Sequence, residues 1–495
     1  MRFLLPAPVA LPLLFAALSV IAYRHQWLQR LFGVVGVASS LVVAVALLVL
    51  VERDGVAAVT LGGWPAPVGI SLVADLFTGL MLVVGLATVL CVLVYAIGQR
   101  GADDLPAFHP TYLVLTAGVS LAFLAGDLFN LYVAFEITLT ASYVLITLGG
   151  KRDQVRHGMT YVVVNLVSSL MFLTGIALVY AATGTVNMAD LAGRLGEVPE
   201  GLRAALGLLF LVVFGVKAAM FPVFNWLPDS YPTARSPVTA VFAGLLTKVG
   251  VYCLIRSQTL LFPEDGPSVL ILSIAGLTMI VGVLGAIAQN DMKRILSFHI
   301  VSQIGYMLLG LGLFTVAGLA GAILFVVHQI PVKTALFLTS GLVEEGAGST
   351  ALDRIGGLLK RAPLTAALFG LAAMSLAGIP PFSGFVGKLA LIEAGFGAEA
   401  WVIVGVSLVG SLLTLFSMAK IWNGVFWGKP ERPTPQIAEG PARLHGPVLM
   451  NGATIVLVGV TLAVAVFAGP LYDLCVRAAE GLVDPSAYID AVLAR

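Results

Sequence analysis

The chain has 495 residues, of which 59% are hydrophobic and only 11% are charged, and its net charge is +1. Soluble domains carry roughly 25% charged residues, so this composition excludes a soluble enzyme, and the balanced charge gives no sign of a nucleic acid partner. Apolar runs of about 20 residues, long enough to span a bilayer, recur almost from end to end. The sequence therefore predicts an all-α polytopic membrane protein.

Fourteen membrane spans are predicted, beginning near residues 3, 30, 73, 110, 128, 158, 204, 236, 267, 292, 318, 364, 400 and 447. The first apolar run is long and is followed at once by Arg24, His25 and Arg30, so we interpret it as a span with its N-terminus outside and not as a signal peptide. Residues 52–72 are rich in Gly, Pro and β-branched residues, which favours a hairpin outside the membrane. The tail from about residue 471 is expected to form a short surface helix.

The charges of the loops support this orientation. Of the 22 Lys and Arg residues that lie at or beyond the ends of the apolar runs, 15 fall in loops that would face inside and seven in segments that would face outside. Loops on the cytoplasmic side carry an excess of Lys and Arg. We therefore expect both termini of the chain to lie outside.

Five cationic side chains lie inside the predicted spans, and all five are lysines. Arginine keeps its proton under ordinary conditions, whereas a desolvated lysine can lose its proton near neutral pH. A buried set of releasable cations therefore indicates proton handling within the membrane. Lys420 lies close enough to the end of its span to reach the interface, and we leave it out of the candidates, which are Lys217, Lys248, Lys333 and Lys388.

One carboxylate accompanies these lysines. Glu136, in LYVAFEITLTASY, sits in the middle of a span, and burying an unpaired carboxylate is costly, so this residue is either neutral or paired with a cation from another helix. Lys217 is the candidate partner. A purely structural ion pair is the alternative, but buried pairs stabilise weakly compared with apolar replacements, which favours a functional pair. Asp75, Asp127 and Arg256 lie near span ends, where interfacial capping accounts for them.

Prolines accompany several of the buried ionisable residues, and a proline at membrane depth frees backbone groups that need protein or water partners. Spans four to eight and nine to thirteen form two sets of five, in which the fourth helix is interrupted and carries a lysine. An odd number of spans forces the second set to be inverted, as in transporters with a path at a repeat interface. The expected regions are 1–109, with three spans and the hairpin; 110–262, the first repeat; 263–428, the second repeat; and 429–495, the last span and tail. Interruptions are predicted in the seventh, eighth and twelfth helices, and Pro331 lies between His328 and Lys333 in the eleventh.

The tenth span carries a polar stripe. His299, Gln303 and Tyr306 follow one another at i, i+4 and i+7, on one face of a helix. Because histidine titrates near neutral pH, this stripe is suited to line a water-filled route. A satisfied core histidine is the equal alternative.

Motifs for other chemistry are missing from the sequence. Cys91, Cys253 and Cys475 are scattered and match no metal or disulfide spacing. Gly387-Lys388 looks like the end of a phosphate-binding loop but lacks the upstream glycine that the loop requires. We therefore expect no cofactor, no metal and no enzyme activity, and the energy must come from an ion gradient or a neighbouring subunit.

Five blocks of the sequence resemble the antiporter-like membrane subunits that are shared by respiratory complex I, membrane-bound hydrogenases and multisubunit Mrp-type cation/proton antiporters. The resemblance runs roughly from the third span to the thirteenth, and within the family the wording GLLTKVGVY is most similar to the Mrp-type branch. The blocks are LYVAFEI, GVKAAMFPVFNWLPDSYP, SPVTAVFAGLLTKVGVY, DMKRILSFHIVSQIGYM and GIPPFSGFVGKLAL.

The resemblance implies two inverted repeats whose half-channels are joined by a hydrophilic axis along the middle of the membrane. It also implies exchange of protons for a cation such as Na⁺, other membrane subunits as partners, and the plasma membrane of a prokaryote as the location. One departure is Arg235, which stands in ARSPVTA where a small residue or proline is expected. Carried over by motif, Glu136 and Lys217 form the coupled pair, Lys248 is the central relay, Lys388 is the terminal lysine, and His328 and Lys333 lie between them.

Three other interpretations stay open at this point. A proton-pumping subunit of a redox enzyme would use the same residues with another energy source. A solitary transporter of an organic solute would need a substrate-sized cavity and would act without partners. A scaffold subunit with degenerate channel residues would need none of the lysines.

Overall fold

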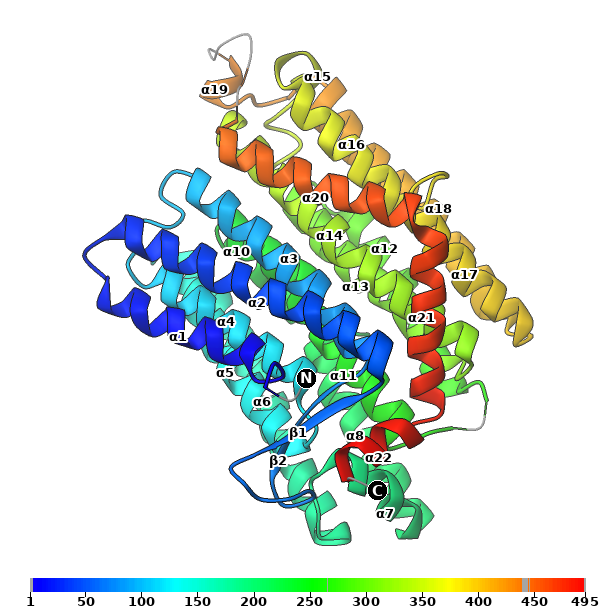
Figure 1. Cartoon of the computed structure of the whole chain (residues 1–495). Helices are drawn as coiled ribbons and strands as arrows, with labels where there is room; N and C mark the ends of the chain where they lie inside the picture. Colours follow the sequence, from blue (N-terminus) through cyan, green and yellow to red (C-terminus); the bar gives the residue numbers. More distant parts are fainter. Residues whose placement is uncertain (1–2, 265, 439–443, 445, 494–495) are drawn as a thin grey trace.

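The computed structural model describes residues 3–264, 266–438, 444 and 446–493. Within them the chain is a bundle of closely packed helices with one small sheet (Figure 1). Eleven helices are long and apolar enough to cross a membrane, and three shorter apolar helices, 7–21, 108–124 and 363–377, occupy further predicted places. Helices suit this composition because they satisfy their own backbone groups where no water is present. The number of membrane crossings stays a prediction.

The N-terminal region contains α1 (Ala7–Ile21), α2 (Gln26–Asp54), β1 (Ala57–Leu61), β2 (Ile70–Ala74) and α3 (Leu76–Gly98). The strands pair antiparallel, with Ala57 opposite Ala74 and Leu61 opposite Ile70. The hairpin predicted within 52–72 is thereby confirmed, two residues longer at its end.

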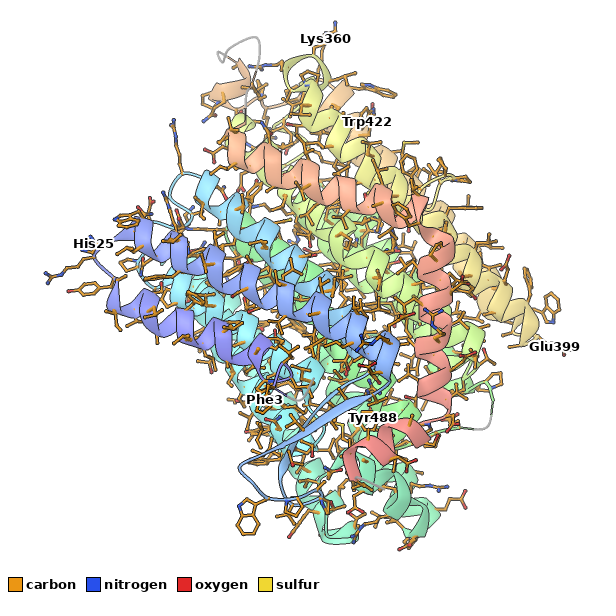
Figure 2. All side chains as sticks on the ribbon, in the orientation of Figure 1. Phe3, His25, Lys360, Glu399, Trp422 and Tyr488 are labelled. Carbon is orange, nitrogen blue, oxygen red and sulfur yellow. The ribbon has the colours of Figure 1, made fainter. Side chains whose placement is uncertain are left out.

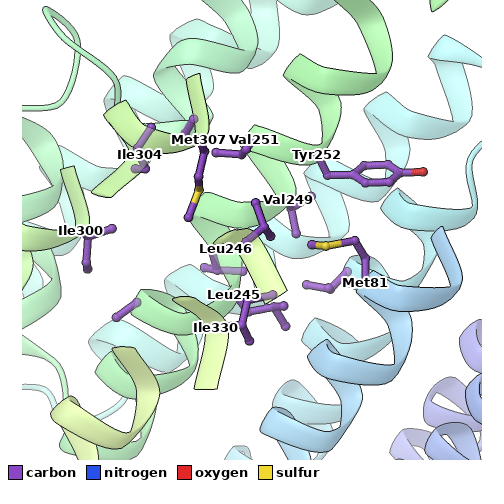
Figure 3. Packing of buried hydrophobic residues seen from close by; sticks show 14 of the residues in the cluster. Met81, Leu245, Leu246, Val249, Val251, Tyr252, Ile300, Ile304, Met307 and Ile330 are labelled. Carbon is purple, nitrogen blue, oxygen red and sulfur yellow. The ribbon is translucent and has the colours of Figure 1, made fainter. Parts of the chain in front are cut away.

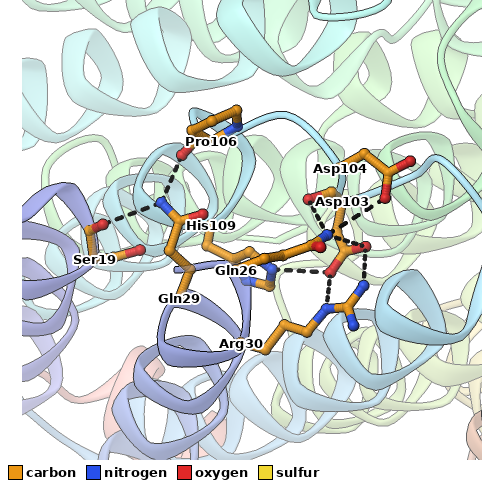
Figure 4. A network of polar contacts seen from close by, with 8 residues as sticks. All are labelled: Ser19, Gln26, Gln29, Arg30, Asp103, Asp104, Pro106 and His109. Carbon is orange, nitrogen blue, oxygen red and sulfur yellow. Dashed lines mark hydrogen bonds and ion pairs between the residues drawn. The ribbon is translucent and has the colours of Figure 1, made fainter. Parts of the chain in front are cut away.

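A polar network ties the loop after α3 to α2 (Figure 4). The Arg30 guanidinium donates to Asp103 at 2.7 and 2.9 Å, and Nε2 of the buried His109 lies 3.1 Å from the same carboxylate. Burial alone would raise the pKa of Asp103, but the hydrogen bonds from His109 and Arg30 hold it below its ordinary value. The network therefore fixes the start of the next helix against the N-terminal bundle.

The first set of five predicted spans is built from eleven short and long elements. They are α4 (Phe108–Leu124), α5 (Leu128–Thr147), α6 (Arg152–Thr183), α7 (Met188–Arg194), η1 (Leu195–Glu197), α8 (Glu200–Ala218), α9 (Trp226–Ser230), η2 (Tyr231–Thr233), α10 (Ser236–Val241), η3 (Phe242–Leu246) and α11 (Thr247–Leu260).

The second set and the C-terminal region follow. Their elements are α12 (Val269–Ala288), α13 (Met292–Gly312), α14 (Val316–Ala347), α15 (Leu358–Arg361), α16 (Pro363–Ala377), α17 (Ser383–Gly397), α18 (Trp401–Trp422), η4 (Asn423–Trp427), α19 (Pro435–Ala438), α20 (Val448–Val466), α21 (Ala468–Val483) and α22 (Ser486–Leu493). The surface helix predicted from about residue 471 is present as two helices, α21 and α22.

The two sets repeat one another with a constant offset of 164 residues at their best-matched points. Helix α6 runs from 152 to 183 and α14 from 316 to 347, and each ends at a left-handed glycine, 184 and 348. Asp127 and Asp291 cap the preceding helices and pair with residues 187 and 351. In Figure 1 the chain leaves α6 toward α7 at the bottom and leaves α14 toward α15 at the top. The two sets are therefore inverted relative to one another, while the boundaries at 110–262 and 263–428 stay a prediction.

Two of the three predicted helix interruptions are present. Helix α8 ends at Ala218 before α9 begins, and α16 ends at Ala377 before α17 begins. The eighth span is not interrupted: it continues from α10 into α11 through η3, a π-helical turn, which inserts a residue without opening the helix. Helix α14 likewise continues past Pro331.

Helix α14 lies at the centre of the bundle and is buried along almost its whole length. It contacts α10 and η3 of the first set, α13, α16 and α17 of the second, and α3, α20 and α21 outside them. Apolar side chains from three of these regions meet around α11 (Figure 3). The central helix therefore joins the two repeats.

Candidate functional site

Four buried lysines lie on four helices that contact one another in series. Helix α8 contacts α11, the π-helical turn before α11 contacts α14, and α14 contacts α17. None of the four lysines is more than 6% exposed. In order along this series they are Lys217, Lys248, Lys333 and Lys388.

Glycines allow the close approach of these helices beside the lysines. A Cβ atom on Gly250 of α11 would lie 2.7 Å from the carbonyl carbon of Lys217, and one on Gly244 would lie 2.0 Å from Oγ1 of Thr334, next to Lys333. Any side chain at either glycine would push neighbouring helices apart. The spacing between adjacent lysine-bearing helices therefore depends on both positions.

Lys217 is hydrogen-bonded to α6. Its Nζ donates to the carbonyl of Asn165 and to Oγ of Ser169, both at 3.1 Å, and lies 5.4 Å from the centre of the Phe135 ring. A cavity of about 30 Å³ beside it has room for a water molecule. The side chain is thus held by neutral oxygens in a small polar space.

Glu136 does not form the direct ion pair with Lys217 that the sequence suggested. Its Oε1 is buried without a hydrogen-bond partner among the described residues, while the amine of Lys217 is turned to Asn165 and Ser169. The two charges still interact electrostatically across the gap. A change in the charge of one therefore affects the other without a shared hydrogen bond.

Lys248 is held by the π-helical turn of its own span. Its Nζ donates to the carbonyl of Ala243 at 2.6 Å. A π-helical turn leaves carbonyls out of the regular α-helical pattern, and such turns often occur at functional sites. The local irregularity therefore supplies the lysine with its acceptor.

Lys333 differs from the other three lysines because its buried Nζ has no hydrogen-bond partner among the described residues. The charges of Lys248 and Lys388 act on it from either side. Nearby on the same helix, Gln329 donates to Gln303 of α13 at 3.3 Å. A charged Lys333 is thus unfavourable unless water or a neighbour compensates it.

His328 links α14 to the interruption of the twelfth span. Its Nδ1 lies 2.8 Å from Oγ of Ser383, which lies 2.9 Å from Oγ of Ser375. These two serines stand on either side of the break between α16 and α17. Hydroxyls and an imidazole in contact can pass a proton along hydrogen bonds.

Lys388 closes the end of α16. Its Nζ donates to the carbonyls of Leu376 and Ala377 at 3.3 and 2.9 Å and to Oγ of Ser411 at 2.9 Å. Carbonyls in the last turn of a helix lack intrahelical donors and carry partial negative charge. The predicted break therefore provides the acceptors of this lysine. Its Nζ also lies 5.0 Å from the centre of the Tyr306 ring.

The polar stripe of the tenth span divides between two neighbours. Nε2 of His299 lies 2.8 Å from Oγ of Ser417, and Tyr306 donates to the carbonyl of Ser407, both on α18. Gln303 instead faces Gln329 of α14. All three stripe residues are buried. Gln303 contacts the helix that carries Lys333, and His299 lies in the electrostatic field of Lys333 and Lys388.

Several charged residues have partners that the sequence did not reveal. Lys420, expected to reach the interface, donates to the carbonyls of Ile287 and Gln289 at the end of α12. Arg256 was attributed to interfacial capping, and this was wrong: it is 5% exposed and pairs with Asp75 at 2.6 Å. Asp75 itself caps α3, as expected. The buried cations are therefore not lysines alone.

Two further charged residues, Arg235 and Lys293, lie at the starts of helices in the two repeats. Arg235 is the residue that precedes α10. Lys293 is buried on α13 and pairs with Glu344 at 2.6 Å. Among the described residues no group of three or more His, Cys, Asp or Glu side chains is placed to hold a metal ion.

Comparisons with known proteins cover the whole chain. Residues 125–414 match the family described as NADH:quinone oxidoreductase/Mrp antiporter, TM. The chain is 43% identical to the D-type subunit of the Na⁺/H⁺ antiporter of Alkalihalophilus pseudofirmus over 100% of both chains, and 39% identical to its counterpart in Bacillus subtilis over 98% of both. A chain in the structure of the Mrp complex from Dietzia sp. DQ12-45-1b superposes with a TM-score of 0.92 at 35% identity over 100% of both chains.

Proposed function

Because this chain belongs to the NADH:quinone oxidoreductase/Mrp antiporter membrane family, we propose that it is the D-type subunit of a multisubunit Na⁺/H⁺ antiporter and that it carries the protons. Such a subunit is a secondary transporter and not an enzyme. It lies in a bacterial plasma membrane, with other membrane subunits as partners and both termini outside.

One observation carries the proton role: the four buried lysines lie on helices that contact in series from the first repeat to the second. Three of them are held by neutral oxygen atoms and one has no partner among the described residues. Neutral acceptors leave a lysine free to lose its proton, whereas a tight carboxylate partner would hold the charged form.

We infer the following sequence of events. A proton taken up in the first repeat changes the charge of the Glu136–Lys217 couple, whose members interact without a shared hydrogen bond. The altered field favours proton movement from Lys248 to Lys333, and then through His328 or Lys388 to the other side, with His299 at its flank. Because these groups interact, the titration belongs to the whole network and not to one residue. Na⁺ moves in exchange, using partner subunits.

The test is Na⁺-dependent collapse of a proton gradient in inside-out vesicles that contain the whole complex. Glu136→Gln and Lys217→Met should each abolish exchange while the complex still assembles. Lys420→Met is the matched control. That lysine is also partly buried and bound to carbonyls, but it lies outside the series of four lysines. A complex that carries Lys420→Met should therefore keep its Na⁺/H⁺ exchange. Exchange that survives both Glu136→Gln and Lys217→Met would rule out this mechanism.

Purification of the native assembly separates this proposal from a redox-driven pump. Co-purification of membrane subunits alone, without flavin or iron–sulfur absorbance, is the expected result. Redox subunits with those chromophores would assign the chain to a pump, and transport by the isolated chain would indicate a solitary transporter.

A further inference from the structure

Helix α11 carries a second cation beyond the lysine of the proposed path. Lys248, Tyr252 and Arg256 follow one another at i, i+4 and i+8, so they share one face of the helix. Arg256 is two turns closer to the end of the molecule that holds the β1–β2 hairpin and α22, which lie in contact. In the predicted orientation this is the outside.

Arg256 is enclosed by aromatic rings. Its guanidinium carbon lies 5.8 Å from the ring centre of Phe77, 5.5 Å from that of Tyr252 and 5.2 Å from that of Tyr488. Tyr488 comes from the C-terminal helix α22 (Figure 2) and is itself buried. Cation–π contacts of this kind become stronger when they are shielded from water.

A carboxylate holds the guanidinium from the hairpin side. Oδ2 of Asp75 accepts from Arg256 at 2.6 Å, while Oδ1 accepts from the backbone of Thr78. The Asp75 side chain is 14% exposed and that of Arg256 is 6% exposed. The carboxylate therefore lies nearer to water, and the guanidinium nearer to the interior.

Tyr252 lies between Lys248 and Arg256 along α11, and its hydroxyl accepts from Arg256 at 3.4 Å. Its ring packs 4.7 Å from Phe77 and 5.1 Å from Phe123, and its hydroxyl donates to the carbonyl of Phe123. Figure 3 shows this hydroxyl pointing away from the apolar side chains around α11. From Lys248 toward the hairpin end, the same face of α11 thus carries first an aromatic ring and then a cation.

We propose that Arg256, held by Asp75 and covered by Tyr488, is a fixed-charge barrier that separates a proton on Lys248 from the water at the hairpin end of the molecule. Arginine is suited to this task because it keeps its proton, whereas lysine can release it. A buried arginine excludes protons and cations in water-selective pores for the same reason. Without such a barrier, Lys248 would exchange protons directly with that side, and transport would be uncoupled from Na⁺.

This inference rests on the proposed role of Lys248 as a proton carrier. It adds a function for the C-terminal helix, which the proton path itself does not use. Helix α21 packs against α14, α3 and α11, which supports the position from which α22 places Tyr488.

The test measures passive proton flux without Na⁺ in proteoliposomes that contain the purified complete complex, driven by a potassium diffusion potential. The double variant Asp75→Asn with Arg256→Met removes the barrier charge without leaving an unpaired buried carboxylate. It should raise passive flux by about tenfold, equivalent to about 1.4 kcal/mol of lost barrier. Arg256→Lys keeps a cation next to Asp75 and should leak less than the double variant.

Tyr488 provides a milder test that leaves the ion pair in place. Tyr488→Ala should raise the leak by a smaller factor, and Tyr488→Phe, which keeps the ring, should not raise it. Unchanged passive flux in the assembled double variant and in Tyr488→Ala would overturn the barrier.

Adding Lys248→Met to the double variant identifies the route. The leak should disappear, because the barrier would no longer guard a proton carrier; a leak that persists would overturn the assignment of the barrier to Lys248. Lys248→Met alone tests the proposed function separately: retained Na⁺/H⁺ exchange would contradict the relay, whatever the leak of the other variants.

Discussion

The two repeats place a lysine at their interrupted helices but surround it differently. In the first repeat Lys217 is bound to Asn165 and Ser169 and lies in the field of Glu136. In the second, Lys388 is bound to the end of α16 and to Ser411. The first lysine is thus coupled to a side-chain charge, and the second to a helix end.

The offset of 164 residues shows where the difference originates. It relates Asn165 to Gln329 and Ser169 to Lys333, because α6 begins at 152 and α14 at 316. The position that gives Lys217 a hydroxyl acceptor therefore holds, in the second repeat, the lysine whose amine has no partner among the described residues. The two repeats thus share their helix arrangement but differ in their buried charges. The first has a carboxylate, Glu136, with its lysine, and the second has an additional lysine, Lys333, and no matching carboxylate among these candidates.

Among the positions that differ between the two repeats, the largest expected effect comes from removing that additional lysine. Lys333→Met should reduce exchange by at least about tenfold, which needs only about 1.4 kcal/mol, and should at the same time stabilise the fold. An unpartnered buried polar group costs about 1–3 kcal/mol, and methionine fills the same space. Na⁺/H⁺ exchange in vesicles and thermal unfolding of the purified complex measure the two effects.

Lys388→Met is the matched comparison. It should also reduce exchange, but it should lower the unfolding temperature, because the carbonyl of Leu376 would lose the amine that donates to it and the carbonyl of Ala377 would keep only the hydroxyl of Ser411. If both variants changed stability in the same direction, the described difference between the two lysines would be wrong.

The sequence predicted where helices break and which lysines are buried better than it predicted which residues those lysines contact. Prolines within long apolar runs located the breaks beside Lys217 and Lys388, and the Gly, Pro and β-branched residues of 52–72 located the hairpin. These features depend on neighbours along the chain. The contact of Lys217 with α6 joins residues 52 positions apart, so no local pattern could reveal it.

Arg256 shows the same limit more clearly. Its distance from the end of α11 suggested an interfacial residue, but its partner Asp75 lies in another region and Tyr488 in a third. The π-helical turn was also beyond the sequence, since the residues 242–246 are ordinary helix formers and glycine. The sequence did hold one signal that Arg256 is buried: its spacing from Lys248 and Tyr252 puts the three residues on one face of a helix.

A smaller effect concerns the matched caps Asp127 and Asp291. Burial raises the pKa of Asp127 from 3.8 to about 6. Because the folded-state pKa is the higher one, the folded protein favours the protonated carboxyl, and ionising it costs stability. The cost is absent below about pH 4, grows as the pH rises and is complete above about pH 6.

Asp127→Asn should therefore stabilise the protein by about 3 kcal/mol at pH 8 and have little effect at pH 4. Asparagine is also a good helix cap, so the hydrogen bond to the backbone of Asn130 is kept. Asp291→Asn is the control, because Oδ2 of that carboxylate already accepts from Thr350 at 2.6 Å, and no comparable gain at pH 8 is expected. Thermal unfolding at the two pH values measures the difference, and an equal gain at pH 4 and pH 8 would contradict the titration.

The smallest expected effect comes from the residue that distinguishes these two caps. Thr350 donates to Asp291, and its counterpart 164 residues earlier is Val186, which leaves Oδ2 of Asp127 buried without a partner among the described residues. Val186→Thr should supply the missing donor and stabilise the protein by about 1 kcal/mol, while Thr350→Val should destabilise it by a similar amount. In a double-mutant cycle with Asp127→Asn, the gain from Val186→Thr should shrink, because the charged acceptor is gone. Additive effects would mean that the new hydroxyl does not reach Asp127, and that the two caps differ in backbone geometry and not only in one side chain.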